Sequence, residues 1–336
     1  MKKSIMKKYF VIILCLSAQT LLAQMPKHIG NFALFQQYYN PALTAYDYSS
    51  LKMFYRAQYA GFDDAPRSIF ISGELDPSDL RLVNSENRHV SELNYHNHRQ
   101  QAGHHAMGLA IWHDSFGAFT ETLFNMNYSA RVSLTEALAL RAGGVVSYNI
   151  NRLNMTRLSF EQANDPVYGN AAMGFYNAHR TDINVGLALT HEQFYVGYAL
   201  QNVMREGLYF GDDFLRETVS RKHLVQGGAR KTISEELELV INGIFSYDRF
   251  QRLSFDVQAK SVFLKTFWAG AGYRQRSAYT ITAGFIMRKI NLSYLLEIPA
   301  GRSSALSNLT HEVALTFDLI QVQQDSWRQR REAITW

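Results

Sequence analysis

The sequence predicts an all-β protein: an antiparallel, up-and-down transmembrane β-barrel of the outer-membrane type, with about fourteen strands. Three observations lead to this fold class. Apolar and polar side chains alternate through most of the chain, a short apolar segment of the secretory kind comes first, and long and short connections alternate between the periodic segments. Because side chains on a β-strand point to opposite faces in turn, each periodic segment has one apolar and one polar face.

The first 23 residues are predicted to be a secretory signal peptide. A lysine-rich start precedes an apolar run of about ten residues and the small residue Ala23, the usual order in such signals. A membrane-spanning helix is the alternative, but it needs about 20 apolar residues. The only cysteine, Cys15, lies in this segment, so the mature chain is expected to have no disulfide and no cysteine metal site.

The formal net charge of +5 is mostly that of the signal segment. Four lysines lie there without any acidic residue, and the rest of the chain carries a formal charge of +1. A nearly neutral mature protein gives no electrostatic case for binding nucleic acid.

The first predicted strands form a β-hairpin that follows an N-terminal lead-in. The lead-in, residues 24–50, shows no clean periodicity. Apolar residues then occupy the odd positions over 51–59 and again over 69–75, and the stretch between these segments is rich in Gly, Asp and Pro. Such residues are typical of a turn between two strands. The barrel is predicted to occupy residues 51–320.

The same alternation returns after residue 104 and continues almost to the end of the chain. Two predicted loops, at about 152–178 and 204–218, interrupt it, and a polar, basic tail, residues 321–336, follows it. The remaining strands are predicted at 105–113, 121–132, 138–148, 181–189, 194–200, 223–231, 237–247, 253–260, 267–274, 279–287, 291–298 and 309–319.

In a membrane barrel the apolar faces of the strands meet lipid and the polar faces line the lumen. We expect lipid-facing side chains at Leu239, Ile241, Phe255 and Val257. A soluble β-sandwich alternates too, but it does not need so apolar a face on nearly every strand. The predicted lumen charges, which we expect to pair and help fill the barrel, are Arg56, Glu121, Arg131, Arg141, Asp182, Glu238, Asp256, Lys260, Arg274, Glu297 and Glu312.

The connections predict the orientation of the barrel. With both termini in the periplasm, the long connections at 152–178, 204–218 and 299–308 lie outside and most short turns lie inside, as is usual. The exception is the polar segment 77–104, which is long and periplasmic. We expect it to dock a periplasmic partner, because inner turns are usually short. Several of its histidines could chelate a metal, but they lack ordered partners, so a polar loop is favoured: His89, His96, His98, His104 and His105.

Five short motifs resemble, in order, those of a known family. They are Asn40-Pro41-Ala42, then Arg56-x-Gln58-Tyr59-x-Gly61-Phe62, the turn Asp114-x-x-Gly117, the pair Tyr273-Arg274 in a late strand of the form Gly-x-x-Tyr-Arg, and His311-Glu312 in the last strand. With these motifs the chain resembles the PorP/SprF membrane proteins of the type IX secretion system, found in the outer membrane of Bacteroidetes. It departs at Tyr59, where the family often has Trp, and at Leu309-Thr310, where Gly-Ser is frequent.

The resemblance implies an outer-membrane protein that supports secretion or cell-surface anchoring of large secreted proteins such as gliding adhesins, without catalysis. The implied partners are those secreted surface proteins, other type IX secretion or periplasmic anchoring components, and outer-membrane lipid. Two alternatives stay open: a channel or transporter for solutes or hydrophobic ligands, and an enzyme. No local signature joins Ser and His into a nucleophile and base, so no catalytic residue, cofactor or metal is predicted.

Overall fold

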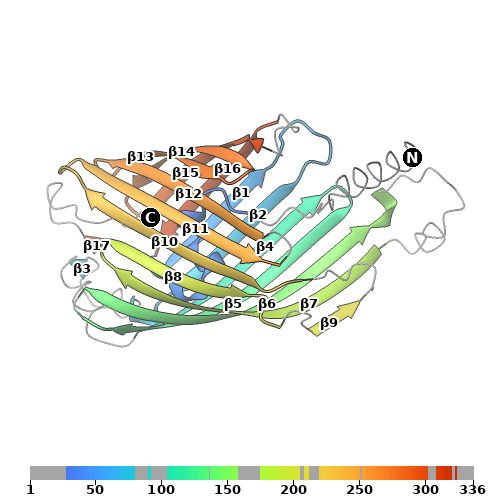
Figure 1. Ribbon diagram of the computed structural model, residues 1–336, viewed down its shortest axis with the longest axis horizontal. Helices are drawn as coiled ribbons and strands as arrows, with labels where there is room; N and C mark the ends of the chain where they lie inside the picture. The colour runs from blue at the N-terminus through green and yellow to red at the C-terminus, as the bar shows by residue number, and fades with distance from the viewer. Residues whose placement is uncertain are drawn as a thin grey trace, which may run out of the picture.

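The computed structural model describes residues 28–79, 90–91, 104–135, 137–157, 175–204, 208–211, 219–249, 252–301, 308–319 and 322–323. Its main feature is a 15-stranded antiparallel sheet that closes on itself, because β6 pairs with both β5 and β7 (Figure 1). Fourteen strands form the closed wall, and the short strand β9 is attached to β7 beside it. This confirms the predicted fold class.

The wall follows the chain order around the ring, and the first strand pairs with the last. In the part of the chain that the structure describes, no helix is long and apolar enough to cross a lipid bilayer. The strands of the wall are β1 (Ser50–Ala57), β2 (Arg67–Leu75), β4 (His104–Phe116), β5 (Phe119–Ser133), β6 (Leu138–Asn154), β7 (Phe175–His191), β8 (Phe194–Gln201), β10 (Lys222–Thr232), β11 (Leu237–Asp248), β12 (Arg252–Phe263), β13 (Phe267–Arg274), β14 (Ala278–Met287), β15 (Ile290–Pro299) and β16 (Thr310–Asp318).

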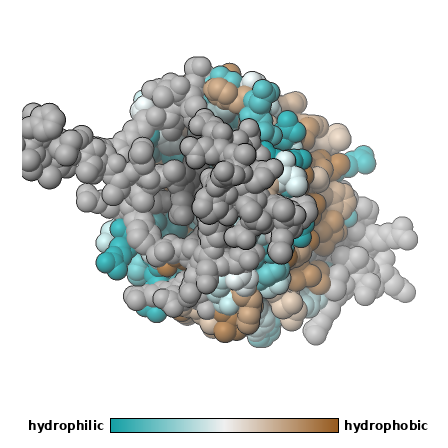
Figure 2. Space-filling view, turned by 90° about the vertical axis from the view of Figure 1, so that its right-hand side faces the viewer, coloured by the Kyte–Doolittle hydropathy of each residue, from teal (hydrophilic) through white to brown (hydrophobic). Residues whose placement is uncertain are grey.

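The two faces of the wall differ as the alternation predicts. Leu239 and Ile241 are exposed on the outside, and Phe255 and Val257 are half-buried beside them. All the predicted lumen charges are buried or half-buried. Figure 2 views one end of the barrel and shows hydrophobic side chains along the outside of the wall. The exterior therefore has the apolar surface that a barrel presents to lipid.

The antiparallel order places the long and short connections at opposite ends. The strand ends that are joined by the connections 58–66, 155–174, 202–221 and 300–309 lie on the right of Figure 1, at the end here called the outer end. Short turns such as 192–193 lie at the opposite, inner end. At the inner end, β3 (Val90–Ser91) pairs in parallel with β17 (Val322–Gln323), whereas most of segment 77–104 lies outside the described residues.

The structure corrects the predicted boundaries at the outer end. β6 continues to Asn154 and β7 begins at Phe175, so their ladder is longer than the segments predicted at 138–148 and 181–189. β9 (Leu208–Gly211) also lies where a loop was predicted. The apolar–polar alternation weakens there, although the backbone pairing between the strands continues, and pairing leaves no periodic pattern in the sequence.

The lead-in, as far as it is described, lies inside the barrel. Residues 28–49, here called the plug, form the short turns η1 (Phe32–Leu34), α2 (Gln36–Tyr39) and η2 (Pro41–Leu43). Nearly every one of these residues is buried. Because the wall surrounds the plug on all sides, its apolar residues have no single face to follow, which explains the missing periodicity.

Candidate functional site: the plugged lumen

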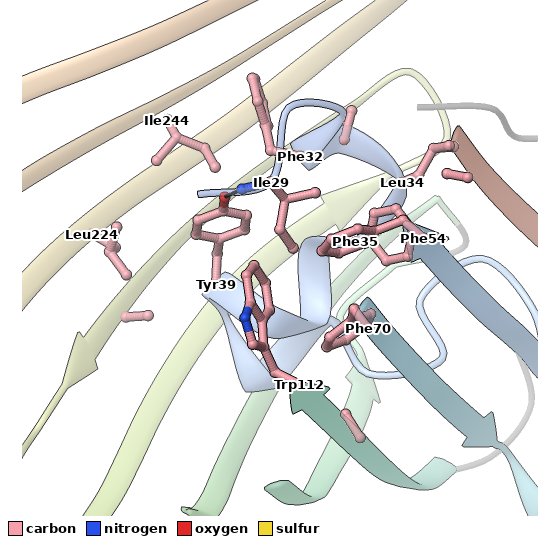
Figure 3. Close-up of a cluster of buried hydrophobic side chains, with 14 residues drawn as sticks. Ile29, Phe32, Leu34, Phe35, Tyr39, Phe54, Phe70, Trp112, Leu224 and Ile244 are labelled. Carbon is pink, nitrogen blue, oxygen red and sulfur yellow. Dashed lines mark hydrogen bonds between the residues drawn. The ribbon is translucent and has the colours of Figure 1, made fainter. Parts of the chain in front are cut away.

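An aromatic cluster joins the plug to three adjacent strands. Phe54, Phe70 and Trp112 project inward from β1, β2 and β4 (Figure 3). The ring of Phe35 lies 5.1 Å from that of Phe54 and 5.4 Å from that of Phe70. Tyr38 stacks on Trp112 at 5.0 Å. Since such pairs each add about 0.5–1.5 kcal/mol beyond the burial of area, this cluster stabilises the plug in the lumen.

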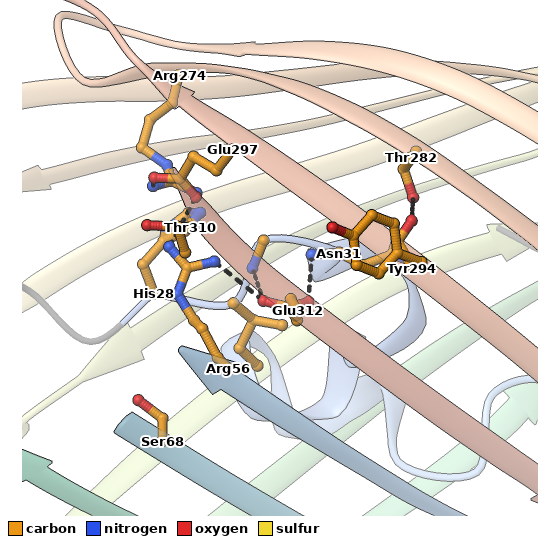
Figure 4. Close-up of polar contacts among 12 residues, drawn as sticks. His28, Asn31, Arg56, Ser68, Arg274, Thr282, Tyr294, Glu297, Thr310 and Glu312 are labelled. Atoms are coloured by element: carbon orange, nitrogen blue, oxygen red, sulfur yellow. Dashed lines mark hydrogen bonds and ion pairs between the residues drawn. The ribbon is translucent and has the colours of Figure 1, made fainter. Parts of the chain in front are cut away.

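Glu312 holds the start of the plug near the outer end of the barrel. Its carboxylate accepts hydrogen bonds from the backbone N–H of Gly30 at 2.8 Å and of Asn31 at 2.9 Å (Figure 4). Arg56 Nη1 lies 3.1 Å from the same carboxylate. A Cβ atom on residue 30 would lie 2.9 Å from both the guanidinium and the carboxylate. A larger residue at position 30 would therefore displace the side chains of Arg56 and Glu312 from this arrangement.

A chain of alternating charges extends from this carboxylate across the wall. Arg56 also contacts Glu297 at 2.6 Å, and Arg274 Nη1 lies 2.8 Å from the second oxygen of Glu297. Arg274 Nε then lies 3.4 Å from Asp256. Most of these side chains are nearly excluded from water. Removing one partner of such a buried network leaves a charge unbalanced, at a cost of about 3–5 kcal/mol.

His28 closes the network from the plug side. Its Nε2 lies 3.1 Å from Asp256 Oδ2. Burial, and then the positive charges of Arg274, Arg56 and Lys222, hold the pKa of His28 well below its usual range. The neutral imidazole is therefore the form that fits this site at neutral pH.

Two further wall residues hold the same part of the plug. Gln258 on β12 donates to the carbonyl oxygen of Gly30. Lys260 Nζ donates to Asn31 Oδ1 at 3.0 Å and lies 4.6 Å from the centre of the Trp268 ring. These contacts and those of Glu312, Arg56 and His28 are together called the outer anchor. The anchor thus draws on five wall strands.

Asn40 shapes the middle of the plug. Its Oδ1 accepts the N–H of Ala42 at 3.0 Å and so caps η2, whose first residue is Pro41. Both are favoured residues for the start of a helical turn. Its Nδ2 donates to the backbone oxygen of Leu187 at 3.1 Å, so one side chain both shapes the turn and binds it to the wall.

Three glycines of the wall make room for this turn. Gly143, Gly186 and Gly197 lie on the neighbouring strands β6, β7 and β8. A Cβ atom on Gly143 would lie 2.5 Å from the backbone of Pro41, and one on Gly186 or Gly197 would overlap the side-chain amide of Asn40. Together they form a shallow recess, here called the glycine recess, that no other residue type can provide.

A second set of charges holds the end of the plug towards the inner end. Glu74 accepts the N–H of Ala45 at 2.7 Å and pairs with Lys52 at 3.0 Å. The guanidinium of Arg141 lies 5.1 Å from the centre of the Tyr46 ring, which is a cation–π distance. These contacts are called the inner anchor. The plug is thus held at its start, middle and end.

The family-motif residues divide between the plug site and the outer end. Asn40, Pro41 and Ala42 form the turn in the glycine recess, and Arg56, Arg274 and Glu312 belong to the outer anchor or its charge chain. Gln58, Tyr59, Gly61 and Phe62 lie in or at the β1–β2 connection, where Tyr59 has φ 49° and Gly61 has φ 102°. Asp114 accepts the hydroxyl of Ser68 at 2.6 Å, and Gly117 donates to the backbone of Asp64 at 3.2 Å.

Two motif residues face outward instead. The ring of Tyr273 packs 5.3 Å from that of Tyr279, and His311 Nδ1 lies 2.6 Å from the hydroxyl of Tyr294. The site also contains residues that sequence reasoning did not single out, above all Gly143 and Glu74. One signal was present: three aromatic side chains interrupt the polar faces of consecutive strands.

Part of the histidine set lies outside the described residues. His104 Nδ1 is 3.0 Å from the hydroxyl of Ser78, and His105 Nδ1 is 2.6 Å from that of Tyr128. Within the described ranges, no group of three or more His, Cys, Asp or Glu is placed to hold a metal ion.

A closed antiparallel wall with an apolar exterior, and a lumen occupied by the chain's own N-terminal segment, defines a plugged barrel of the outer-membrane class. The family described as "Type IX secretion system membrane protein PorP/SprF" matches residues 21–317, and the chain belongs to this family. It is therefore an outer-membrane barrel of the type IX secretion system. A search of the curated proteins gave no match.

Solved structures show a likeness of fold. The Ralstonia pickettii toluene transporter TbuX is 10% identical, with 86% of this chain and 94% of that chain covered and a TM-score of 0.47. The CymD monoaromatic hydrocarbon channel is 11% identical, with 88% and 95% covered and a TM-score of 0.46. A Pseudomonas aeruginosa FadL homologue is 9% identical, with 83% and 92% covered and a TM-score of 0.42.

Proposed function

We propose that this barrel serves the type IX secretion system as a plugged scaffold, which supports the secretion or surface anchoring of large secreted proteins such as gliding adhesins, and does not conduct solutes. The observation that carries the proposal is the plug, held by the outer anchor, the glycine recess and the inner anchor. A lumen occupied in this way offers surfaces to partners at both ends of the barrel instead of a path through it.

The free energy needed to move the plug out of the lumen distinguishes a scaffold from a channel. Opening the lumen would break the two hydrogen bonds that Glu312 accepts from the backbone of Gly30 and Asn31, and a hydrogen bond to a charged group contributes about 1.5–3 kcal/mol. Losing both, at about 3–6 kcal/mol, reduces the open fraction to roughly one in a hundred to one in several tens of thousands. The glycine recess, the aromatic cluster and the inner anchor lower it further. A channel for solutes or hydrophobic ligands is therefore the weaker hypothesis.

We assign one class of partner to each end of the barrel. Secreted surface proteins would meet the outer end, where the long connections and several motif residues lie. Other type IX secretion or periplasmic anchoring components would meet the inner end, through the segment 77–104. We propose no catalytic role and no cofactor, since these buried charges of the lumen are paired with one another and, through Glu312, with the plug.

A deletion strain tests this proposal. Cells lacking the chain should lose most of one or more large surface proteins, and an affinity-tagged copy should restore them and co-purify with them from detergent extracts. In parallel, the purified wild-type barrel should be silent in planar lipid bilayers. A steady conductance of the wild-type protein, with surface proteins unchanged in the deletion strain, would instead support a channel.

A further inference from the structure

The outer ends of β6 and β7 form an extension of the wall with β9 at its side (Figure 1, right). β6 and β7 have 17 residues each, and β8, the next strand of the ring, has eight. β9 takes the place of β8 along the outer part of β7, where Ala178 to Thr181 pair with Gly211 to Leu208. The outer ends of β6 and β7 together with β9 are called the outer flap.

The inner face of the outer flap is packed. Leu153 at the end of β6 and Met155, just after β6, form a buried cluster with Ala118 and Ala178, and Tyr176 and Tyr209 pack against it. Because this cluster fixes the three strands, the side chains on the opposite face have defined positions relative to one another.

The outer face of the outer flap carries cationic and hydrogen-bonding side chains. Arg152 is exposed on β6, directly opposite Asn177 on β7, and its Nε donates to Asn177 Oδ1 at 3.0 Å. One step lower on the same face, His179 Nδ1 lies 2.9 Å from the hydroxyl of Tyr148, and the rings stack at 5.9 Å. That contact uses Nδ1, so a further partner of His179 would be met by Nε2.

The height of these residues matches the headgroup region of a bilayer. A strand residue advances about 2.5 Å along the barrel axis at the usual tilt. The ten residue-to-residue steps from Leu140 to Ile150, two residues on the lipid face of β6, therefore span about 25 Å, the usual height of the apolar band. Arg152 follows directly on that face, and His179 is opposite Ile150. Both side chains thus lie at the upper boundary of the band.

Large apolar side chains flank Arg152 and His179. On β9, Phe210 is opposite His179 and is 65% exposed, and Leu208 is opposite Thr181 and is 56% exposed. A surface with a guanidinium, an imidazole and exposed apolar groups at headgroup height is complementary to an anionic lipid. The guanidinium favours phosphate, to which it donates two parallel hydrogen bonds.

We propose that the outer face of the outer flap binds a phosphorylated lipid of the leaflet at the outer end. Arg152 and His179 contact the phosphate, and Phe210 and Leu208 pack against the upper part of the acyl chains. This site needs the barrel in its membrane but no particular secreted partner. The contact with the phosphate would hold one side of the barrel against the lipid headgroup. It would add to the contact with acyl chains that all strands share.

Native mass spectrometry of the purified full chain with diphosphorylated lipid A as the probe tests this site. The double variant Arg152→Gln/His179→Gln should bind at least about tenfold more weakly than wild type. The matched control is Arg67→Gln, which removes an exposed cation at the same end, where β2 begins; it should bind like wild type. Equal binding by the double variant and wild type would overturn the proposal.

A measurement on the wild-type protein alone keeps the test independent of any folding defect. The same lipid A after enzymatic removal of its phosphates should bind at least about tenfold more weakly than the diphosphorylated form. Phosphatidylethanolamine, which is zwitterionic, should compete poorly against the phosphorylated probe. Equal affinity for the phosphorylated and dephosphorylated forms would show that acyl chains alone are recognised, and the site would be rejected.

Discussion

Two adjacent glycines on β6 show how single residues decide whether the plug fits. Gly143 faces the lumen, where a Cβ atom would lie 2.5 Å from the backbone of Pro41. Gly144 faces the other way, and the nearest atom to its Cβ would be the backbone oxygen of Asn184 at 3.8 Å, an ordinary contact. The backbone of Pro41 cannot move aside as a flexible side chain would.

Gly143→Ala should therefore destabilise the folded protein by about 1–3 kcal/mol, the usual cost of overpacking. Gly144→Ala, on the same strand, should be close to neutral. The measurement is the temperature at which the folded band on a detergent gel converts to the unfolded band, together with protease cleavage within residues 28–49. Equal behaviour of the two variants would mean that the turn of η2 does not occupy the glycine recess.

His28 should make the attachment of the plug depend on pH. Its pKa is depressed in the folded state, so once the plug detaches His28 binds more protons than when it is docked. The stability of the outer anchor is then complete above about pH 6.5, the pKa of a free histidine, and decreases as the pH falls below that value. The groups that face it are Asp256, Arg274, Arg56 and Lys222.

Hydrogen exchange of the backbone amides of residues 29–35 measures this dependence. Exchange, corrected for its intrinsic pH dependence, should be faster at pH 5.5 than at pH 7.5. His28→Asn should reduce the difference between the two pH values. If the wild-type protein is equally protected at both values, protonation of His28 does not loosen the anchor.

At the scale of elements, the strands were predictable from the sequence and the plug was not. Outward side chains of all strands meet the same environment, so the alternation is regular and gives both the number of strands and their faces. The plug contacts wall on every side and has no such pattern. Phe54, Phe70 and Trp112 carried the missing signal, because aromatic residues on a lumen face require an apolar partner inside. The glycines of the recess, by contrast, become meaningful only once the plug is placed against them.

Replacing residues 29–44 with a Gly/Ser linker of equal length should open the lumen. The wall has its own complete ladder of hydrogen bonds, so the variant should still form a heat-modifiable barrel, although a less stable one. In planar lipid bilayers it should give discrete conductance steps, whereas the wild type gives none. An assembled but silent variant would show that something other than the plug closes the barrel.

The whole molecule is arranged between two apolar regions, lipid outside and the aromatic cluster inside, with charged networks between them. Only the outer region depends on the membrane. A charge placed on the exterior should therefore have a cost that depends on depth. Met126 and Val132, both exposed on the same face of β5, differ in this respect, since Met126 is near the middle of the strand and Val132 is near its inner end.

Met126→Arg should lower the stability of the folded barrel by about 2–4 kcal/mol, and Val132→Arg by about 0–1 kcal/mol. Both variants add the same charge to the same face of the same strand. Urea unfolding in lipid vesicles, followed by tryptophan fluorescence, compares the two. If both substitutions had the same effect, the apolar band would not be centred on Met126.

The contact between Gly30 and Glu312 also has a consequence for the timing of assembly. The two residues are 282 positions apart in the chain, and Glu312 belongs to the last strand of the wall. Bringing such distant residues together costs about 5 kcal/mol of loop-closure entropy if nothing between them is folded. Once β1 and β16 have paired, Arg56 and Glu312 lie opposite each other. Most of the loop-closure entropy has then already been lost in forming the wall. The N-terminal segment, synthesised before any strand, is therefore among the last parts of the protein to find its place.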